Sequence, residues 1–199
     1  MTFGTGFTWQ ACEALPEADR TRSLPLGSGV ALAERKLDVW FVLHGETCAT
    51  SAWGARAELG QPVALWGPRL VFEPPADTGS YLLVSDETGL SAMYAVLDDV
   101  VAAYAATEVT LIAEFDDVVN RVDFPLSSRA NVVGVDRCGA APGSTPLPIE
   151  AMQALDIEAH VYAFGSGGSR QTTEVRIHLR YVRNLPANLV SMTGYWGSP

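Results

Sequence analysis

The sequence has few of the residues that build metal centres and disulfide frameworks. Its three cysteines, Cys12, Cys48 and Cys138, are widely spaced and include no C-x-x-C pair, so we expect neither a zinc site nor a disulfide framework. The three histidines are far apart and form no ligand motif. Lys36 is the only lysine beside twelve arginines, which leaves almost no amine for Schiff-base chemistry.

Positive charge is also scarce, because the formal net charge is −10 at pH 7. Binding of nucleic acid or of an anionic membrane surface depends on lysine and arginine, so we expect neither partner. No apolar run is long enough to span a bilayer. The N-terminal stretch shows no basic region followed by an apolar core, which predicts a cytoplasmic protein.

The 199 residues are 48% hydrophobic and 18% charged, a balance typical of a folded chain. Residues 1–37 are rich in turn formers and predict a wrapping segment. Strands are predicted at 37–45 and 61–68, with a short helix at 50–59 between them. We therefore predict a small β-rich part at 1–75 and a second domain at 76–199.

From residue 81 onward, apolar strands alternate with helices. The predicted strands are 81–85, 108–115, 130–137, 159–165 and 188–196, and the predicted helices are 87–104, 148–155 and 170–184. This alternation predicts an α/β fold, with a mainly parallel sheet covered on both faces in three layers. Residues 138–148 predict a loop long enough to reach across a cleft.

The first of these strands breaks at "SDETG", residues 85–89. Ligands collect where a strand leads into a helix, because unpaired helix amides and the helix dipole face the cleft. A nucleotide pyrophosphate usually needs glycines at this turn, and two carboxylates would repel it. The simplest interpretation is that Ser85 or Asp86 caps the helix and that Glu87 favours its positive end.

Three motifs are together similar to those of the siderophore-interacting proteins, flavin-dependent ferric-siderophore reductases of the ferredoxin-reductase superfamily. They are "YLLVSDETGLSAMYAVL", the earlier "FVLHG…W" and the terminal "GYWGSP". The resemblance implies a flavin-binding β-barrel, then an α/β domain that admits NAD(P)H, with the iron chelate received in the cleft between them. It also implies that the acidic break is a family feature.

The sequence departs from the family pattern at the flavin motifs. The barrel's first strands have no counterpart before Arg20, the tyrosine expected near Arg22 is missing, and a Gly-Pro pair has become Cys48-Ala49. The family has a Gly-Glu pair after the fourth strand of the α/β domain; here it falls on Gly167-Gly168, which lacks the acid. The arginine that closes the family's Gly-Tyr-Trp-Arg motif is replaced by Gly197. We therefore predict that FAD is lost. If it is retained, the resemblance implies these contacts: Arg22, His44, Thr50 and Trp53.

Without flavin, hydride and one-electron chemistry would be absent, but a pocket with aromatic walls could still orient a small, largely apolar metabolite. We therefore predict a cofactor-independent cyclase, isomerase or lyase. The candidates for proton transfer are His44, Asp86, Glu87 and Tyr195. The candidates for substrate binding are Trp53, Trp66, Thr88, Arg176, Arg180 and Trp196.

Two alternatives stay open. One is a working reductase that uses FAD and NAD(P)H, with Arg176, Arg180 and Arg183 forming a positive stripe toward an anionic chelate. The other is a non-catalytic partner or binding protein, in which two chains form a homodimer through the incomplete barrel.

Overall fold

The computed structural model describes residues 38–43, 49–61, 63, 71–103, 108–116 and 130–197. These residues fall into two compact units, each taken by itself below. Residues 41–43, 49–61 and 63 belong to the smaller unit, and residues 38–40 together with the described residues from 71 onward belong to the larger one. The division at residue 75 stays a prediction. The described part of the chain contains no helix that is both long and apolar enough to cross a membrane.

The smaller unit contains one described helix, α2 (Ala49–Arg56), close to the predicted helix at 50–59. Ser51 and Ala52 are its buried residues, and the Trp53 ring lies 5.4 Å from the ring of Phe41. The predicted strand at 37–45 is not found over its described residues, since only Val39 forms an isolated β-bridge. A strand needs a neighbour that completes its hydrogen bonds, and no ladder is described at 38–43. The rest of this strand, most of the strand at 61–68 and the barrel lie outside the described residues.

A five-stranded sheet forms the centre of the larger unit. Its strands are β1 (Ser80–Ser85), β2 (Glu108–Phe115), β3 (Asn131–Asp136), β4 (Val161–Gly168) and β5 (Val190–Trp196). They are ordered β3-β2-β1-β4-β5, and every neighbouring pair is parallel. The predicted parallel sheet is confirmed.

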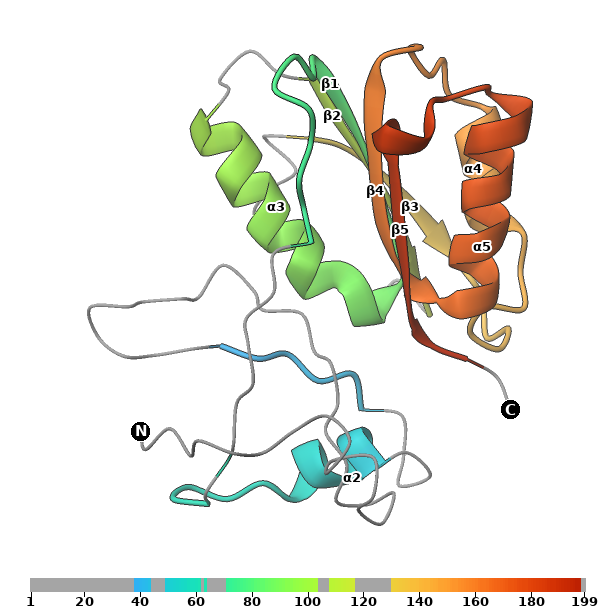
Figure 1. The fold of residues 1–199 in the computed structure, drawn as a ribbon. Coiled ribbons are helices and arrows are strands. Elements are labelled where there is room, and N and C mark those ends of the chain that lie inside the picture. The colour runs from blue at the N-terminus through green and yellow to red at the C-terminus, as the bar shows by residue number, and fades with distance from the viewer. Residues whose placement is uncertain are drawn as a thin grey trace, which may run out of the picture. The chain divides into compact units, whose positions relative to one another are not determined.

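Helices cover both faces of this sheet, as the alternation predicts. The short 3₁₀ turn η3 (Glu87–Gly89) leads into α3 (Leu90–Ala103) on one face, while α4 (Leu147–Gln153) and α5 (Ser169–Ile177) lie on the other (Figure 1). The helix predicted at 170–184 ends differently, because a π-helical turn, η5 (His178–Val182), follows α5. A second 3₁₀ turn, η6 (Ala187–Leu189), precedes β5.

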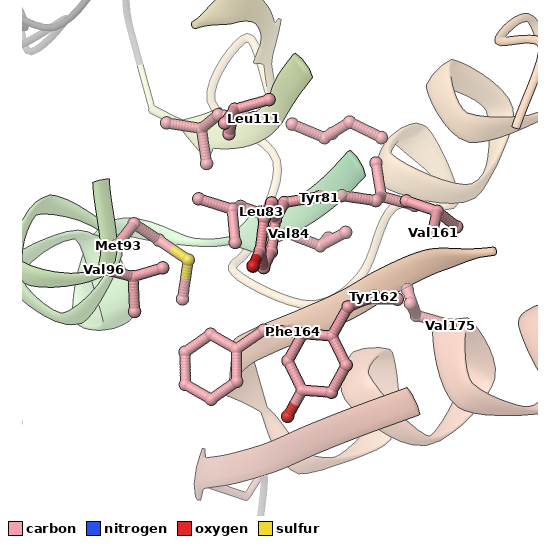
Figure 2. Packing of buried hydrophobic residues seen from close by; sticks show 14 of the residues in the cluster. Tyr81, Leu83, Val84, Met93, Val96, Leu111, Val161, Tyr162, Phe164 and Val175 are labelled. Carbon is pink, nitrogen blue, oxygen red and sulfur yellow. The ribbon is translucent and has the colours of Figure 1, made fainter. Parts of the chain in front are cut away.

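The core lies between these layers. All residues of β1 and β4 are buried, which explains why both strands are nearly continuous apolar or small runs rather than alternating ones. Met93 and Val96 project from α3 toward β1, and Phe164 lies on β4 (Figure 2). Removal of such large side chains from water is the main stabilising contribution to the fold.

The strand order places a topological switch point between β1 and β4. The connection after β1 leads toward β2 on one side, and the strands after β4 continue on the other side. The carboxyl ends of the strands at such a point are the usual place for ligands in open α/β sheets. Residues 86–89 follow β1 at this position.

Candidate functional site at the carboxyl edge of the sheet

Asp86 follows β1 at the switch point and is 2% exposed. Its carboxylate accepts four hydrogen bonds. The donors are the Thr88 amide (2.9 Å) and hydroxyl (2.5 Å) to Oδ1, and the Gly168 amide (3.0 Å) and Trp196 indole (2.9 Å) to Oδ2. Burial raises the pKa of Asp86, and the hydrogen bonds from Thr88 and Trp196 oppose that shift. The carboxylate thus caps η3 and also ties the ends of β4 and β5 to β1.

Glu87 connects the turn after β1 to the ends of β2 and β3. It forms a two-pronged ion pair with Arg137, with Nη1 to Oε2 and Nη2 to Oε1 both 2.8 Å. Oε1 also accepts the Asp116 amide at 2.8 Å. Because Asp116 follows β2 and Arg137 follows β3, Glu87 joins the ends of both strands.

The two adjacent acids therefore connect all five strand ends. Asp86 reaches β4 and β5, and Glu87 reaches β2 and β3, from the turn that follows β1. The capping expected of Asp86 is confirmed, since its side chain is the cap of η3. Proton transfer by either residue stays a prediction, and this geometry does not favour it, because every carboxylate oxygen already accepts at least one hydrogen bond.

Glu114 belongs to the same network and was not singled out from the sequence. It is fully buried, and its two oxygens accept Arg137 Nη1 (3.3 Å) and the Gln171 amide (2.5 Å). Burial raises the pKa of Glu114, while Gln171 and Arg137 oppose the shift. A charged residue inside the apolar run "EVTLIAEF" was the available signal, since a buried charge needs a partner. Nothing in the sequence identified Arg137 or Gln171 as that partner.

The Trp196 indole packs against Gly168 and Gly143 beside Asp86. A Cβ atom at Gly168 would lie 2.8 Å from the indole, and one at Gly143 would lie 3.0 Å from it. The loop that follows β3 therefore does extend to this edge, as far as Gly143. The missing acid at residue 168 now has a physical reason, because the indole lies where a side chain at that position would begin.

Gly167 completes this packing. Its φ of +154° suits glycine, and a Cβ there would lie 2.8 Å from Asp86 Oδ2.

Tyr195 lies beside Trp196 in β5 and is partly buried. Burial raises the pKa of the Tyr195 phenol, and the Ser166 side chain opposes that shift. The structure thus brings Asp86, Glu87, Thr88, Tyr195 and Trp196 to one edge of the sheet.

Each arginine of the predicted stripe donates a hydrogen bond to a backbone carbonyl, and a positive stripe toward a chelate stays a prediction. Arg176 donates to the Met192 carbonyl, Arg180 to the Leu185 carbonyl at 2.8 Å, and Arg183 to the Met152 carbonyl at 3.2 Å. Since α5 begins at the carboxyl end of β4 and runs back along the sheet, Arg180 and Arg183 approach the opposite edge.

Two of the remaining predicted site residues lie in the smaller unit. Thr50 and Trp53 belong to α2, and Trp53 is 43% exposed. A cavity of about 250 Å³ lies against this helix, lined by Ala49, Ala52, Trp53, Arg56 and Gln61. Arg22, His44 and Trp66 lie outside the described residues. Within the described ranges, no group of three His, Cys, Asp or Glu side chains is placed to hold a metal ion.

Comparison with known families identifies the chain. The family model for siderophore-interacting proteins matches residues 78–198, and the model for the siderophore-interacting FAD-binding domain matches residues 8–72. This chain belongs to the siderophore-interacting protein family. An uncharacterized protein of Mycobacterium tuberculosis is 30% identical over 179 residues, which cover 84% of this chain and 62% of the relative.

Solved structures agree with this assignment. A siderophore utilization protein from T. fusca superposes with a TM-score of 0.72 at 25% identity, over 85% of this chain and 64% of that one. The siderophore-interacting protein from Acinetobacter baumannii has the same fold, with a TM-score of 0.75 at 17% identity, over 86% of this chain and 68% of that one. The chain thus spans less than two thirds of the length of its curated relatives.

The prediction that the protein has no cofactor is not supported, because the FAD-binding model matches residues 8–72. The residue types at the start of α2 also suit a flavin's pyrophosphate. The first turn of α2 carries no acidic side chain, and Ala49 and Ala52 leave room along the cavity. A helix start without acids and with small side chains suits a phosphate group.

Proposed function

We propose that this protein is an FAD-dependent ferric-siderophore reductase. The observation that carries the proposal is the pair of family models that match in order along one chain, the FAD-binding domain at 8–72 and the siderophore-interacting domain at 78–198. The similarity to the T. fusca siderophore utilization protein supports it. Iron(III) in its chelate would be the electron acceptor.

FAD supplies one-electron chemistry that side chains lack. The protein's part is to bind and orient the cofactor and the chelate. Thr50, Ala52 and Trp53 of α2 are the described residues that would hold FAD, with the amino end of the helix toward its phosphates. The network of Asp86, Glu87, Glu114 and Arg137 holds the edge of the sheet in one arrangement.

No observation favours the cofactor-independent enzyme. Asp86 and Glu87 are committed to hydrogen bonds and an ion pair that join strand ends, and the match to a flavin-domain model argues for a cofactor. The small-molecule partner is here the ferric chelate. Homodimer formation and a cytoplasmic location stay predictions.

The test is a single-turnover reaction under anaerobic conditions. FAD bound to the protein is reduced photochemically, mixed with an iron(III) siderophore of the hydroxamate or catecholate class, and followed by the return of oxidised-flavin absorbance. We expect protein-bound flavin to be reoxidised about tenfold faster or more than free reduced FAD at equal concentration, because the protein holds donor and acceptor close together. Reoxidation at the rate of free FAD would contradict the proposal.

A matched pair of variants places the flavin. Ala49→Asp adds a carboxylate at the start of α2, where it stabilises the helix but repels a phosphate. Ala55→Asp adds the same charge at the exposed end of that helix. We expect Ala49→Asp to weaken FAD binding by about tenfold or more and Ala55→Asp to change it little. Equal effects of the two substitutions would place the flavin elsewhere.

A further inference from the structure

The end of α5 and the π-helical turn that follows it carry large apolar side chains on the outside of the larger unit. Ile177 is 51% exposed, Tyr181 75% and Val182 62%. The other side of the same segment faces the core, since Val175 and Leu179 are almost completely buried. A surface helix normally has polar side chains on its outer face. When exposed apolar side chains are contiguous, they mark an interaction surface.

The π-helical turn makes these three side chains contiguous. In an α-helix the neighbours one turn along are i+3 and i+4, so Tyr181 would lie near Ile177 and Val182 would not. η5 instead closes its turn at i+5, with the Arg183 amide donating to the His178 carbonyl at 3.0 Å. The wider turn adds Val182 to the face. π-helical turns are frequent at functional sites.

Positive charge surrounds this apolar face. The arginines that flank it, each exposed or partly exposed, are Arg176, Arg180 and Arg183. Residues 169–183 contain four arginines and one acid, Glu174, in a chain whose formal net charge is −10. Glu174 pairs with Arg170 at 2.9 Å. Among the residues that the structure describes, no carboxylate lies within ion-pair distance of the three flanking guanidinium groups.

The flanking guanidinium groups keep their charge and are held in position. Arg176 donates to the Met192 carbonyl and Arg180 to the Leu185 carbonyl. A backbone carbonyl is neutral, so the positive charge is not compensated. A guanidinium has five N–H donors, and one bond to a carbonyl leaves others for a carboxylate. Because these side chains are already ordered, binding a carboxylate costs less conformational entropy.

Charge also identifies the kind of partner. A face with an apolar centre and cations around it complements a surface with an apolar centre and carboxylates around it. Tyrosine and arginine are among the residues that most often dominate such binding. An anionic lipid surface would meet the net charge of −10. A second copy docked through the same face would place like charges opposite each other.

We propose that Ile177, Tyr181 and Val182, with the arginines around them, form the docking surface for an acidic protein. The partner presents apolar side chains surrounded by aspartate and glutamate. This inference is independent of the proposed function. It gives Arg176 and Arg180 carboxylates of a protein as partners, in place of the chelate predicted from their spacing.

The test uses the full chain and a designed acidic peptide as the probe. The peptide is a stapled helix with leucines along one face and glutamates beside them, labelled for fluorescence anisotropy. A second peptide has glutamine at every glutamate position. Tyr181→Ser removes the centre of the docking surface. Val71→Ser is the matched control, because Val71 is 52% exposed and lies in the larger unit outside α5 and η5.

We expect saturable binding of the glutamate peptide, at least about tenfold tighter than that of the glutamine peptide. Tyr181→Ser should weaken it by about tenfold or more, and Val71→Ser should change it little. Raising the salt from about 0.05 M to about 0.5 M should also weaken it. Equal affinity of the two peptides, or equal affinity of Tyr181→Ser and the unmodified chain, would overturn the inference. If Tyr181→Ser does not fold, Ile177→Ser replaces it with the same expected result.

Two measurements address the other occupants. Phosphatidylglycerol vesicles that bind the unmodified chain but not Tyr181→Ser would assign the surface to lipid. A dimer seen by analytical ultracentrifugation and lost in Tyr181→Ser would assign it to a second copy. We expect neither, and either result overturns the inference.

The single-turnover reaction separates this inference from the proposed function. We expect Tyr181→Ser to reoxidise reduced flavin with the ferric chelate at the rate of the unmodified chain. A slower rate in this variant would assign the surface to the chelate and overturn the inference, while the reductase function would stand. Loss of the reaction in the unmodified chain would contradict the function and leave the peptide result unaffected.

Discussion

The Trp196 indole donates a hydrogen bond to Asp86 Oδ2 at 2.9 Å, although 110 residues separate the two positions. The contact joins the turn after the first strand of the sheet to the end of the last one. The hydrogen bond holds both the Asp86 carboxylate and the Trp196 indole in position. Its contribution to the free energy of unfolding can be measured.

A double-mutant cycle measures that coupling. Asp86→Asn and Trp196→Phe each remove one partner, and we expect each to lower the free energy of unfolding by about 1–3 kcal/mol because a buried polar group loses its partner. The double variant should lose less than the sum, with a coupling of about 0.5–3 kcal/mol. Chemical denaturation gives all four values. Strict additivity would mean that the contact contributes nothing.

Gly168→Ala tests the packing of the indole. The new Cβ would lie 2.8 Å from the Trp196 ring, so we expect the variant to lose about 1–3 kcal/mol of unfolding free energy through overpacking. In the Trp196→Ala background the same substitution should cost far less, because the ring is gone. An equal cost in both backgrounds would assign the strain to the backbone at residue 168.

Substitution of Arg137 should destabilise the fold much more than substitution of Glu114. Arg137→Met leaves the buried Glu114 and the partly buried Glu87 without their cation, and we expect it to cost about 3–5 kcal/mol. Glu114→Gln removes one carboxylate and leaves the Arg137–Glu87 pair in place, so it should cost clearly less. Thermal unfolding of both variants checks the order. The reverse order would show that Glu114, not Glu87, is the main partner of Arg137.

His178 predicts one part of the pH dependence. It is 7% exposed, and burial lowers its pKa, with Arg183 adding to the shift. Below the usual pKa of 6.5, the unfolded chain binds a proton at this residue that the folded chain does not, so stability falls as the pH falls. Comparison with His178→Gln isolates the effect. The difference in unfolding free energy, wild type minus variant, should decrease by up to about 1.4 kcal/mol per pH unit below pH 6.5.

Asp86 and Glu114 change the pH dependence of stability in the opposite direction to His178. Burial raises the pKa of both carboxyls, so the folded chain binds protons that the unfolded chain has released. Their contribution to stability is complete at low pH and is lost as the pH rises through the folded-state pKa. In His178→Gln, the free energy of unfolding should therefore rise on mild acidification. A fall in that variant would contradict the direction assigned to the two carboxyls.

The regular part of the fold could be predicted from the sequence. The boundaries of β2 at 108–115 match the prediction, β1 differs from it by one residue at its start, and β3 differs by one residue at each end. These strands are apolar runs between turn formers, so local pattern and burial agree. The π-helical turn at 178–182 was not predicted, because the sequence continues with helical spacing through it.

The candidate site could be predicted only in part. Asp86 and Glu87 were identified, because an acidic break after a strand is a local signal. Their partners Arg137, Gly168 and Trp196 follow other strands, and only the strand order brings them together. The helical spacing of the three arginines suggested a stripe on one face. Spacing along a helix does not show which backbone carbonyls their side chains contact.

The most direct test of the account is whether the protein binds flavin. The purified chain is mixed with FAD, separated from free FAD by gel filtration and scanned in the visible range. The account predicts an absorbance band near 450 nm that corresponds to about one flavin per chain, and its loss in Ala49→Asp. A flat trace from well-folded protein would contradict the proposed reductase and leave the family's fold without its cofactor.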